Sequence, residues 1–198
     1  IPTWGHVDRM GIVGIIANPY SSKDIRRLTG SARIVTDWEK VNVLRRIIIG
    51  IQSLDIDGIV AMDDSSHLVR RSINYPGINI PVEFLEQNIL GNANDTLVAS
   101  QKMAEMKVDV LISLGGDGTN RMISKGFDQH TILPVSTGTN NVFPYDLEGT
   151  HIGICAGLIA TQKIDYSQCT VPSKQILVTL ENGDTDLALV DLAISNAN

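Results

Sequence analysis

Residues 111–121 read LISLGGDGTNR, and this stretch decides the fold. Its first four residues end an apolar run that starts at Val108 and is typical of a buried strand. Three glycines and Asp117 follow at once, and a short helix is predicted from about Asn120 to Lys125. A strand that runs into a glycine-rich loop and then a helix is typical of open α/β sheets, which bind ligands at the carboxyl ends of their strands.

On both sides of this stretch, predicted strands alternate with predicted helices. The clearest helix follows Thr36, which forms a capping box with Glu39 and precedes apolar residues at helical spacing, Trp38 among them. The predicted strands are 11–17, 57–62, 80–85, 108–114 and 131–135, and the predicted helices are 36–50, 65–73, 95–106, 120–125 and 150–160. This alternation predicts an α/β fold, a three-layer, doubly wound, mainly parallel sheet with helices on both faces.

The pattern changes near the C-terminal end of the chain. Residues 175–180 and 187–194 are predicted to be antiparallel strands joined by a hairpin at Asn182-Gly183. We therefore expect an α/β domain over residues 1–165 and the start of a β-rich second domain over residues 166–198. So short a segment seldom folds alone. We expect the second domain to be truncated in this chain and its exposed apolar strands to join copies into a homo-oligomer.

Composition limits the classes of partner. The 198 residues carry a net charge of −6 with a pI of about 5.1, and the basic residues are scattered. Binding to nucleic acid requires a basic face, so we expect no nucleic-acid partner. An acidic protein that binds phosphates must do so locally, through backbone N–H groups, a few cations and a metal ion.

Cysteines and apolar runs give the expected location. Cys155 and Cys169 show no zinc-site spacing, and we expect both to be buried, reduced thiols. The first ten residues do not resemble a signal peptide, and the apolar runs are too short to span a bilayer. These features predict a cytoplasmic protein without a membrane partner.

Asp117 is the unusual residue of the glycine-rich stretch. Glycines let the backbone approach a polyphosphate, and the N-terminus of the next helix offers unpaired N–H groups to it. A carboxylate there repels the ligand unless it holds a metal ion or takes a proton from an attacking hydroxyl. The alternative is that Asp117 caps the helix. On the same helix, Arg121 and Lys125 are expected to face solvent or to reach phosphate oxygens.

A second polar loop follows the next predicted strand. Residues 136–141 read STGTNN, and we expect this strand end to lie beside that of residues 108–114. Hydroxyls, amides and glycines then converge on one cleft. Neither loop is a Walker A loop, which requires Gly-Lys-Ser/Thr. The candidate nucleotide-binding residues of the second loop are Thr137, Gly138, Thr139, Asn140 and Asn141.

The GGDGT run after a hydrophobic strand resembles the signature shared by NAD kinases and by diacylglycerol- and sphingosine-type lipid kinases, with a distant kinship to phosphofructokinases. IANP at 16–19, SKD at 22–24 and STGTNNVFP at 136–144 are most similar to NAD-kinase-like proteins of the acetoin-catabolism protein X type. The resemblance covers roughly residues 11–195.

This resemblance implies a two-domain kinase that transfers a phosphoryl group from ATP, with Mg²⁺, to a hydroxyl of a small nucleotide-like acceptor. In such kinases the aspartate that matches Asp117 activates the acceptor hydroxyl or organises Mg²⁺, and we assign no dedicated metal site. By the same resemblance, the phosphates are held by Gly115, Gly116, Gly118 and Thr119, and further nucleotide contacts come from Asn18, Ser22 and Lys23.

Two departures from the family pattern keep alternatives open. NAD kinases have an Asn-Glu pair early in the second domain, where this chain has Val190 and Asp191. Valine cannot hydrogen-bond a base or ribose, so Asp191 is the candidate acceptor contact and NAD is one candidate substrate. Lipid kinases usually have glycine where Ser22 stands. The alternatives are a diacylglycerol-type lipid kinase and a non-catalytic nucleotide-sensing module.

Overall fold

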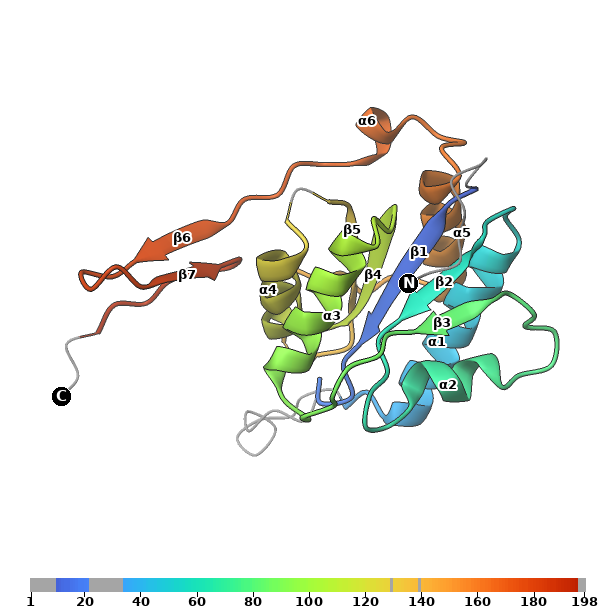
Figure 1. The fold of residues 1–198 in the computed structure, drawn as a ribbon, viewed down its shortest axis with the longest axis horizontal. Helices are drawn as coiled ribbons and strands as arrows, with labels where there is room; N and C mark the ends of the chain where they lie inside the picture. Colours follow the sequence, from blue (N-terminus) through green and yellow to red (C-terminus); the bar gives the residue numbers. More distant parts are fainter. Residues whose placement is uncertain (1–9, 22–33, 129, 139, 196–198) are drawn as a thin grey trace.

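The structure is a computed structural model, and it describes residues 10–21, 34–128, 130–138 and 140–195. Five parallel strands form one sheet in the order β3-β2-β1-β4-β5, as Figure 1 shows. Their bounds are β1 Ile12–Ala17, β2 Gly58–Ala61, β3 Val82–Phe84, β4 Val110–Gly115 and β5 Ile132–Ser136. The predicted strands are therefore confirmed, each shortened or shifted by one to three residues.

Strand order creates a switch point between β1 and β4. After β1 the chain moves outward through β2 to β3, and it then returns to add β4 on the other side of β1. β1 and β4 are buried along their whole length. Their carboxyl ends lie side by side, with Ala17 paired to Leu114. In sheets of this kind ligands bind at such a switch point.

Helices cover both faces of the sheet. The helices α1 (Asp37–Gln52), α2 (Leu68–Ile73) and α5 (Gly149–Ala160) pack on one face, and α3 (Ala93–Glu105) and α4 (Asp117–Gly126) pack on the other (Figure 1). Alternate residues of β1 serve the two cores, because successive side chains of a strand point to opposite faces. The prediction of a three-layer α/β fold is confirmed.

The helix predicted after Thr36 is present with its cap. The Glu39 amide donates to the Thr36 hydroxyl over 3.1 Å. Of the apolar residues at helical spacing, Val41, Leu44, Ile47, Ile48 and Ile51 are buried, whereas the exposed fraction of Trp38 is 58%. Trp38 instead lies under the guanidinium of Arg45, 4.9 Å from the ring centroid, so its inclusion in the apolar stripe was wrong.

Other element bounds differ from the prediction. α4 begins at Asp117, three residues early, because the glycine-rich run enters the helix. β7 is Thr185–Ala188, so the strand predicted at 187–194 is wrong beyond Ala188. β7 pairs with β6 (Ile176–Thr179) as an antiparallel hairpin, preceded by a single helical turn, α6 (Tyr166–Cys169).

This hairpin extends away from the five-stranded sheet (Figure 1) and is tied to α4. Arg121 Nε donates to the Leu187 carbonyl over 2.6 Å, and the Arg121 guanidinium also pairs with Asp186. Lys125 Nζ lies 2.6 Å from Asp186 Oδ1. Arg121 and Lys125 therefore bind the hairpin.

The cysteine prediction was half right. Both thiols are free, but Cys169 is exposed and Cys155 is half-buried, because α6 lies outside the core while α5 packs on the sheet. Burial raises the pKa of the Cys155 thiol. No helix in the described ranges is both long and apolar enough to cross a membrane.

α1 and α5 approach each other through glycines. A Cβ on Gly153 would lie 2.0 Å from the Ile47 carbonyl oxygen, and one on Gly50 would lie 2.6 Å from the Thr150 carbonyl oxygen. Both obstacles are backbone atoms, which no rotamer change can move away. The two helix backbones are therefore in direct contact.

We expect Gly153→Ala to destabilise the protein by about 1–3 kcal/mol, because the added methyl forces α1 and α5 apart. This sign opposes intrinsic helix propensity, which favours Ala over Gly by about 1 kcal/mol. Gly118→Ala in α4 is the matched control, because no atom lies within 4 Å of its added Cβ. Urea denaturation should show a lower free energy of unfolding for Gly153→Ala and no loss for Gly118→Ala. Equal stability of the two variants would contradict the close contact between α1 and α5.

Candidate functional site

Three strand ends meet at one edge of the sheet. Asn18 N donates to the Leu114 carbonyl over 2.9 Å, and Thr137 N donates to the Gly115 carbonyl over 3.0 Å. Gly115 also pairs in register with Ser136. The predicted convergence of the two polar loops is confirmed, and the loop after β1 joins them.

Side chains cross-link these three segments. Asn18 Nδ2 donates to Thr119 Oγ1 over 2.8 Å, and its Oδ1 accepts from Tyr20 N over 2.8 Å. The hydroxyls of Ser21 and Thr137 lie 2.9 Å apart, and Thr137 is buried. Asn18, Thr119 and Thr137 were selected from distant parts of the sequence, and the fold brings them together.

Lys40 was missed at the sequence level. Its side chain is fully buried, and Nζ donates to three carbonyl oxygens of the loop after β1: Asn18 at 3.1 Å, Pro19 at 3.0 Å and Ser21 at 2.8 Å. The signal was available, since Lys40 lies four and seven residues before Leu44 and Ile47 on the apolar face of α1. A cation on that face must find buried acceptors.

Asp117 is the first residue of α4, and its carboxylate reaches the loop after β5. Val142 N lies 3.1 Å from each carboxylate oxygen, and Phe143 N donates to Oδ1 over 2.8 Å. The N-cap of α4 is Gly116, which has no side chain to cap with. Asp117 therefore bridges two strand ends, and the alternative in which it caps its own helix is wrong.

The glycines are required by close packing. A Cβ on Gly115 would lie 2.4 Å from Thr119 Oγ1, and one on Gly116 or Gly138 would lie 2.8 or 2.5 Å from Asn141 Oδ1. None of the three has a positive φ. The Asn141 amide therefore packs against both strand ends, and its Nδ2 also donates to Ser136 Oγ over 2.8 Å. Gly118, in contrast, has open space around it.

The remaining predicted residues are placed differently. Ser22, Lys23 and Thr139 lie outside the described residues. Asn140 is exposed at the loop surface, and Asp191 is exposed beyond β7. Arg121 and Lys125, which were expected to face solvent or to reach phosphate oxygens, instead bind Asp186. The hydrogen bond from Lys125 lowers the pKa of Asp186 to about 2.

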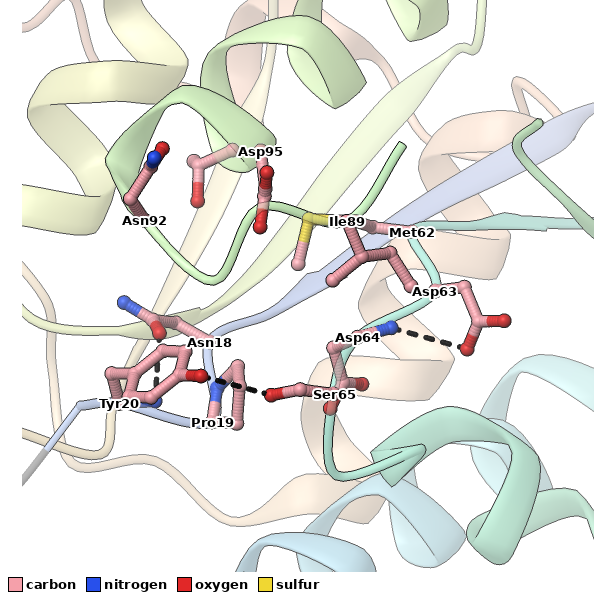
Figure 2. Close-up of a pocket in the computed structure, with 11 residues that line it drawn as sticks. Asn18, Pro19, Tyr20, Met62, Asp63, Asp64, Ser65, Ile89, Asn92 and Asp95 are labelled. Atoms are coloured by element: carbon pink, nitrogen blue, oxygen red, sulfur yellow. Dashed lines mark hydrogen bonds between the residues drawn. The ribbon is translucent and has the colours of Figure 1, made fainter. Parts of the chain in front are cut away.

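A small pocket lies next to Asn18, as Figure 2 shows. It is lined by the loops that follow β1, β2 and β3 and by the start of α3. Burial raises the pKa of Asp64 in its wall, although the carboxylate accepts N–H bonds from Ser66 and Leu68. In the sequence, Asp63-Asp64 directly follows a strand and suits either a ligand contact or an ordinary helix N-terminus, and the helix N-terminus is the preferred interpretation.

All of the sheet except Ile12, together with the loops at its carboxyl edge, lies within the match to one known family. The sequence profile of the ATP-NAD kinase N-terminal domain matches residues 13–145. The chain belongs to the ATP-NAD kinase N-terminal domain family. The resemblance read from GGDGT is thereby confirmed.

A curated relative extends beyond the family match. The chain is 35% identical, over 198 residues, to acetoin catabolism protein X of Cupriavidus necator. The similarity covers 93% of this chain and 55% of that protein. The chain thus spans about half the length of the curated relative it matches.

We expect Lys40→Met to destabilise the protein by about 3 kcal/mol or more, because methionine retains the apolar stem but leaves buried carbonyls without their donor, at about 1–3 kcal/mol each. Lys174→Met is the control, since Lys174 is exposed. Urea unfolding of both variants measures the difference. A Lys40→Met protein within 1 kcal/mol of the wild type would show that the three contacts contribute little.

Proposed function

We propose that this chain transfers a phosphoryl group from ATP to a hydroxyl of a small nucleotide-like acceptor, with NAD as one candidate. Membership of the NAD kinase family supports kinase chemistry. The single observation that carries the proposal is the Asp117 carboxylate, which the amides of Val142 and Phe143 hold at the N-terminus of α4. Phosphoryl transfer depends mainly on positioning and on charge stabilisation, which suits so fixed a group.

The phosphates are proposed to lie at the strand ends of β4 and β5. The first N–H groups of α4 have no partner within the helix, and the open space at Gly118 leaves the backbone approachable there. The proposed nucleotide-binding residues are Asn18, Ser22, Lys23, Gly115, Gly116, Gly118, Thr119, Thr137, Gly138, Thr139, Asn140 and Asn141.

The donor set of the site fits Mg²⁺ bound mostly by phosphate. Within the described residues, no group of three or more His, Cys, Asp or Glu side chains is arranged to hold a metal ion. Mg²⁺ commonly binds one or two carboxylates together with substrate phosphates, so a single Asp117 suffices. When bound, Mg²⁺ neutralises charge on the transferred group. Asp117 either orients that ion or accepts the proton of the acceptor hydroxyl.

The domain division at residue 165 and the acceptor contact of Asp191 belong to the same proposal. The hairpin that follows the division forms its own two-stranded sheet, which is consistent with a second, β-rich unit. Asp191 follows that hairpin and is exposed. Valine at 190 in place of asparagine favours the sensing module as the second candidate function, because it removes a donor and acceptor from the acceptor side.

We expect Asp117→Asn to lower turnover by about 10²–10⁴-fold while Mg-ATP binding persists, because an amide can neither accept the proton nor neutralise a cation. Transfer of labelled phosphate to NAD, to diacylglycerol in vesicles and to a sugar measures this and separates the acceptors. Asp184→Asn in the exposed hairpin turn is the control. If Asp117→Asn retained most activity, Asp117 would be excluded as the base or Mg²⁺-orienting residue. If the wild-type chain bound Mg-ATP without transferring phosphate, the sensing module would be favoured.

We expect Gly138→Val to abolish the rise in melting temperature that Mg-ATP causes. The added side chain occupies the position of the Asn141 amide, which lies 2.5 Å from the Cβ site, and so displaces the loop after β5. Differential scanning fluorimetry with and without Mg-ATP gives the measurement. If Mg-ATP raised the melting temperature of Gly138→Val as much as that of the wild type, the ligand would bind elsewhere.

A further inference from the structure

Helix α1 carries a second stripe of side chains, which the core does not use. Trp38, Asn42, Arg45 and Ile49 follow one another at spacings of four, three and four residues, so they lie along one side of the helix. Among the described residues of the five helices that cover the sheet, Trp38 and Ile49 are the only large hydrophobic side chains that are exposed. The stripe belongs to the sheet face opposite α4 and Asp117 (Figure 1).

Two aromatic rings hold Arg45 within this stripe. Its guanidinium carbon lies 4.9 Å from the centroid of the Trp38 ring and 4.8 Å from that of Tyr75, which follows α2 and is 46% exposed. Arg45 Nη1 donates to Asn42 Oδ1 over 3.1 Å, whereas the buried Nε has no hydrogen-bond partner among the described residues. Tryptophan, tyrosine and arginine are enriched among the residues that dominate protein–protein binding, and groups that already stack lose little freedom on binding.

The stripe matches a second copy of itself in antiparallel orientation. Alternating spacings of four and three residues are those of the seam between two packed helices. A two-fold axis through the middle of the stripe sets Trp38 opposite Ile49 of the second copy and Asn42 opposite its Arg45. Apolar groups then meet apolar groups, and each guanidinium meets an amide that accepts a hydrogen bond.

The charges along α1 favour the same arrangement. Asp37 and Glu39 lie in the first turn, and Arg45 and Arg46 lie about two turns later. Antiparallel pairing brings the acidic start of each helix toward the basic half of the other, whereas parallel pairing in register sets Arg45 beside Arg45. The complement of the stripe is therefore present in the chain itself.

We infer that this stripe joins two copies of the chain into an antiparallel, two-fold symmetric dimer through α1. The inference does not depend on the proposed function, because Asp117 and its helix lie on the other face of the sheet. One helix pair buries less surface than most stable interfaces, so we expect a weak dimer, with a dissociation constant on the order of 10 µM. The exposed strands of the hairpin are the competing surface.

Sedimentation equilibrium of the full chain, at concentrations on either side of that value, tests the inference. Ile49→Lys should weaken the dimer by about tenfold or more, because a symmetric contact would bury two lysines. Leu177→Lys is the matched control, since it makes the same kind of change at an exposed apolar residue of β6. It should leave the dissociation constant within about twofold of the wild-type value.

Substitutions at Asn42 test the antiparallel pairing. Asn42→Lys sets a cation opposite Arg45 of the second copy and should weaken the dimer by about tenfold. Asn42→Asp sets an anion at the same place and should tighten the dimer by about threefold or more. Circular dichroism of each variant confirms that the chain is folded before the dissociation constants are compared.

Fluorescence reports directly on the stripe. The chain has two tryptophans, so Trp38 is the only emitter in a Trp4→Phe background. Its emission should move to shorter wavelength as the concentration rises, because the dimer removes the ring from water. A dimer whose formation leaves the Trp38 emission unchanged would refute the inference.

Three other outcomes would overturn the inference. A wild-type chain that stays monomeric at ten times the expected dissociation constant excludes the dimer. If Leu177→Lys dissociates the dimer and Ile49→Lys does not, the copies associate through the hairpin. If Asn42→Lys and Asn42→Asp weaken the dimer equally, the antiparallel pairing is refuted.

Discussion

The pairing of β1 with β4 is the constraint on which the rest of the site depends. It sets Ala17 beside Leu114, so the loop of Asn18 and the helix of Asp117 leave the sheet as neighbours. Each contact between them follows from this register, including the bond from Asn18 to Thr119. The pairing of β4 with β5 then adds Thr137 and Asn141 to the same edge. Lys40 of α1 holds the loop after β1 in place, because its Nζ donates to three carbonyl oxygens of that loop.

Local charge, rather than net charge, makes an anion site possible in this acidic chain. The helix N-terminus at Asp117 supplies oriented N–H groups, while the neighbouring pocket carries carboxylates. Two regions of opposite charge preference thus lie on either side of Asn18. Such a boundary favours a ligand that is charged at one end only.

The fold could be predicted because buried strands and amphipathic helices leave strong periodic signals. The start of α4 could not, since glycines such as Gly118 are tolerated in a first helical turn where the sequence suggests a loop. The end of β7 was misjudged because its length is set by its partner: β6 is short, and pairing stops at Ala188 although apolar residues continue. Asn18, Thr119 and Thr137, which meet at the strand ends, could be picked out from the sequence. Lys40 could not, because its role arises from contacts with a segment distant in sequence.

Helix α4 carries two unlike attachments. Asp117 stands at its first residue, and Arg121 and Lys125, one and two turns later, hold the hairpin. A helix of ten residues is a stiff rod about 15 Å long, so a tilt at one end is transmitted to the other. The position of the hairpin and the direction of the Asp117 carboxylate are therefore mechanically coupled. In a nuclear magnetic resonance spectrum, the amide signals of Val142 and Phe143, which bind that carboxylate, would report whether the hairpin is docked.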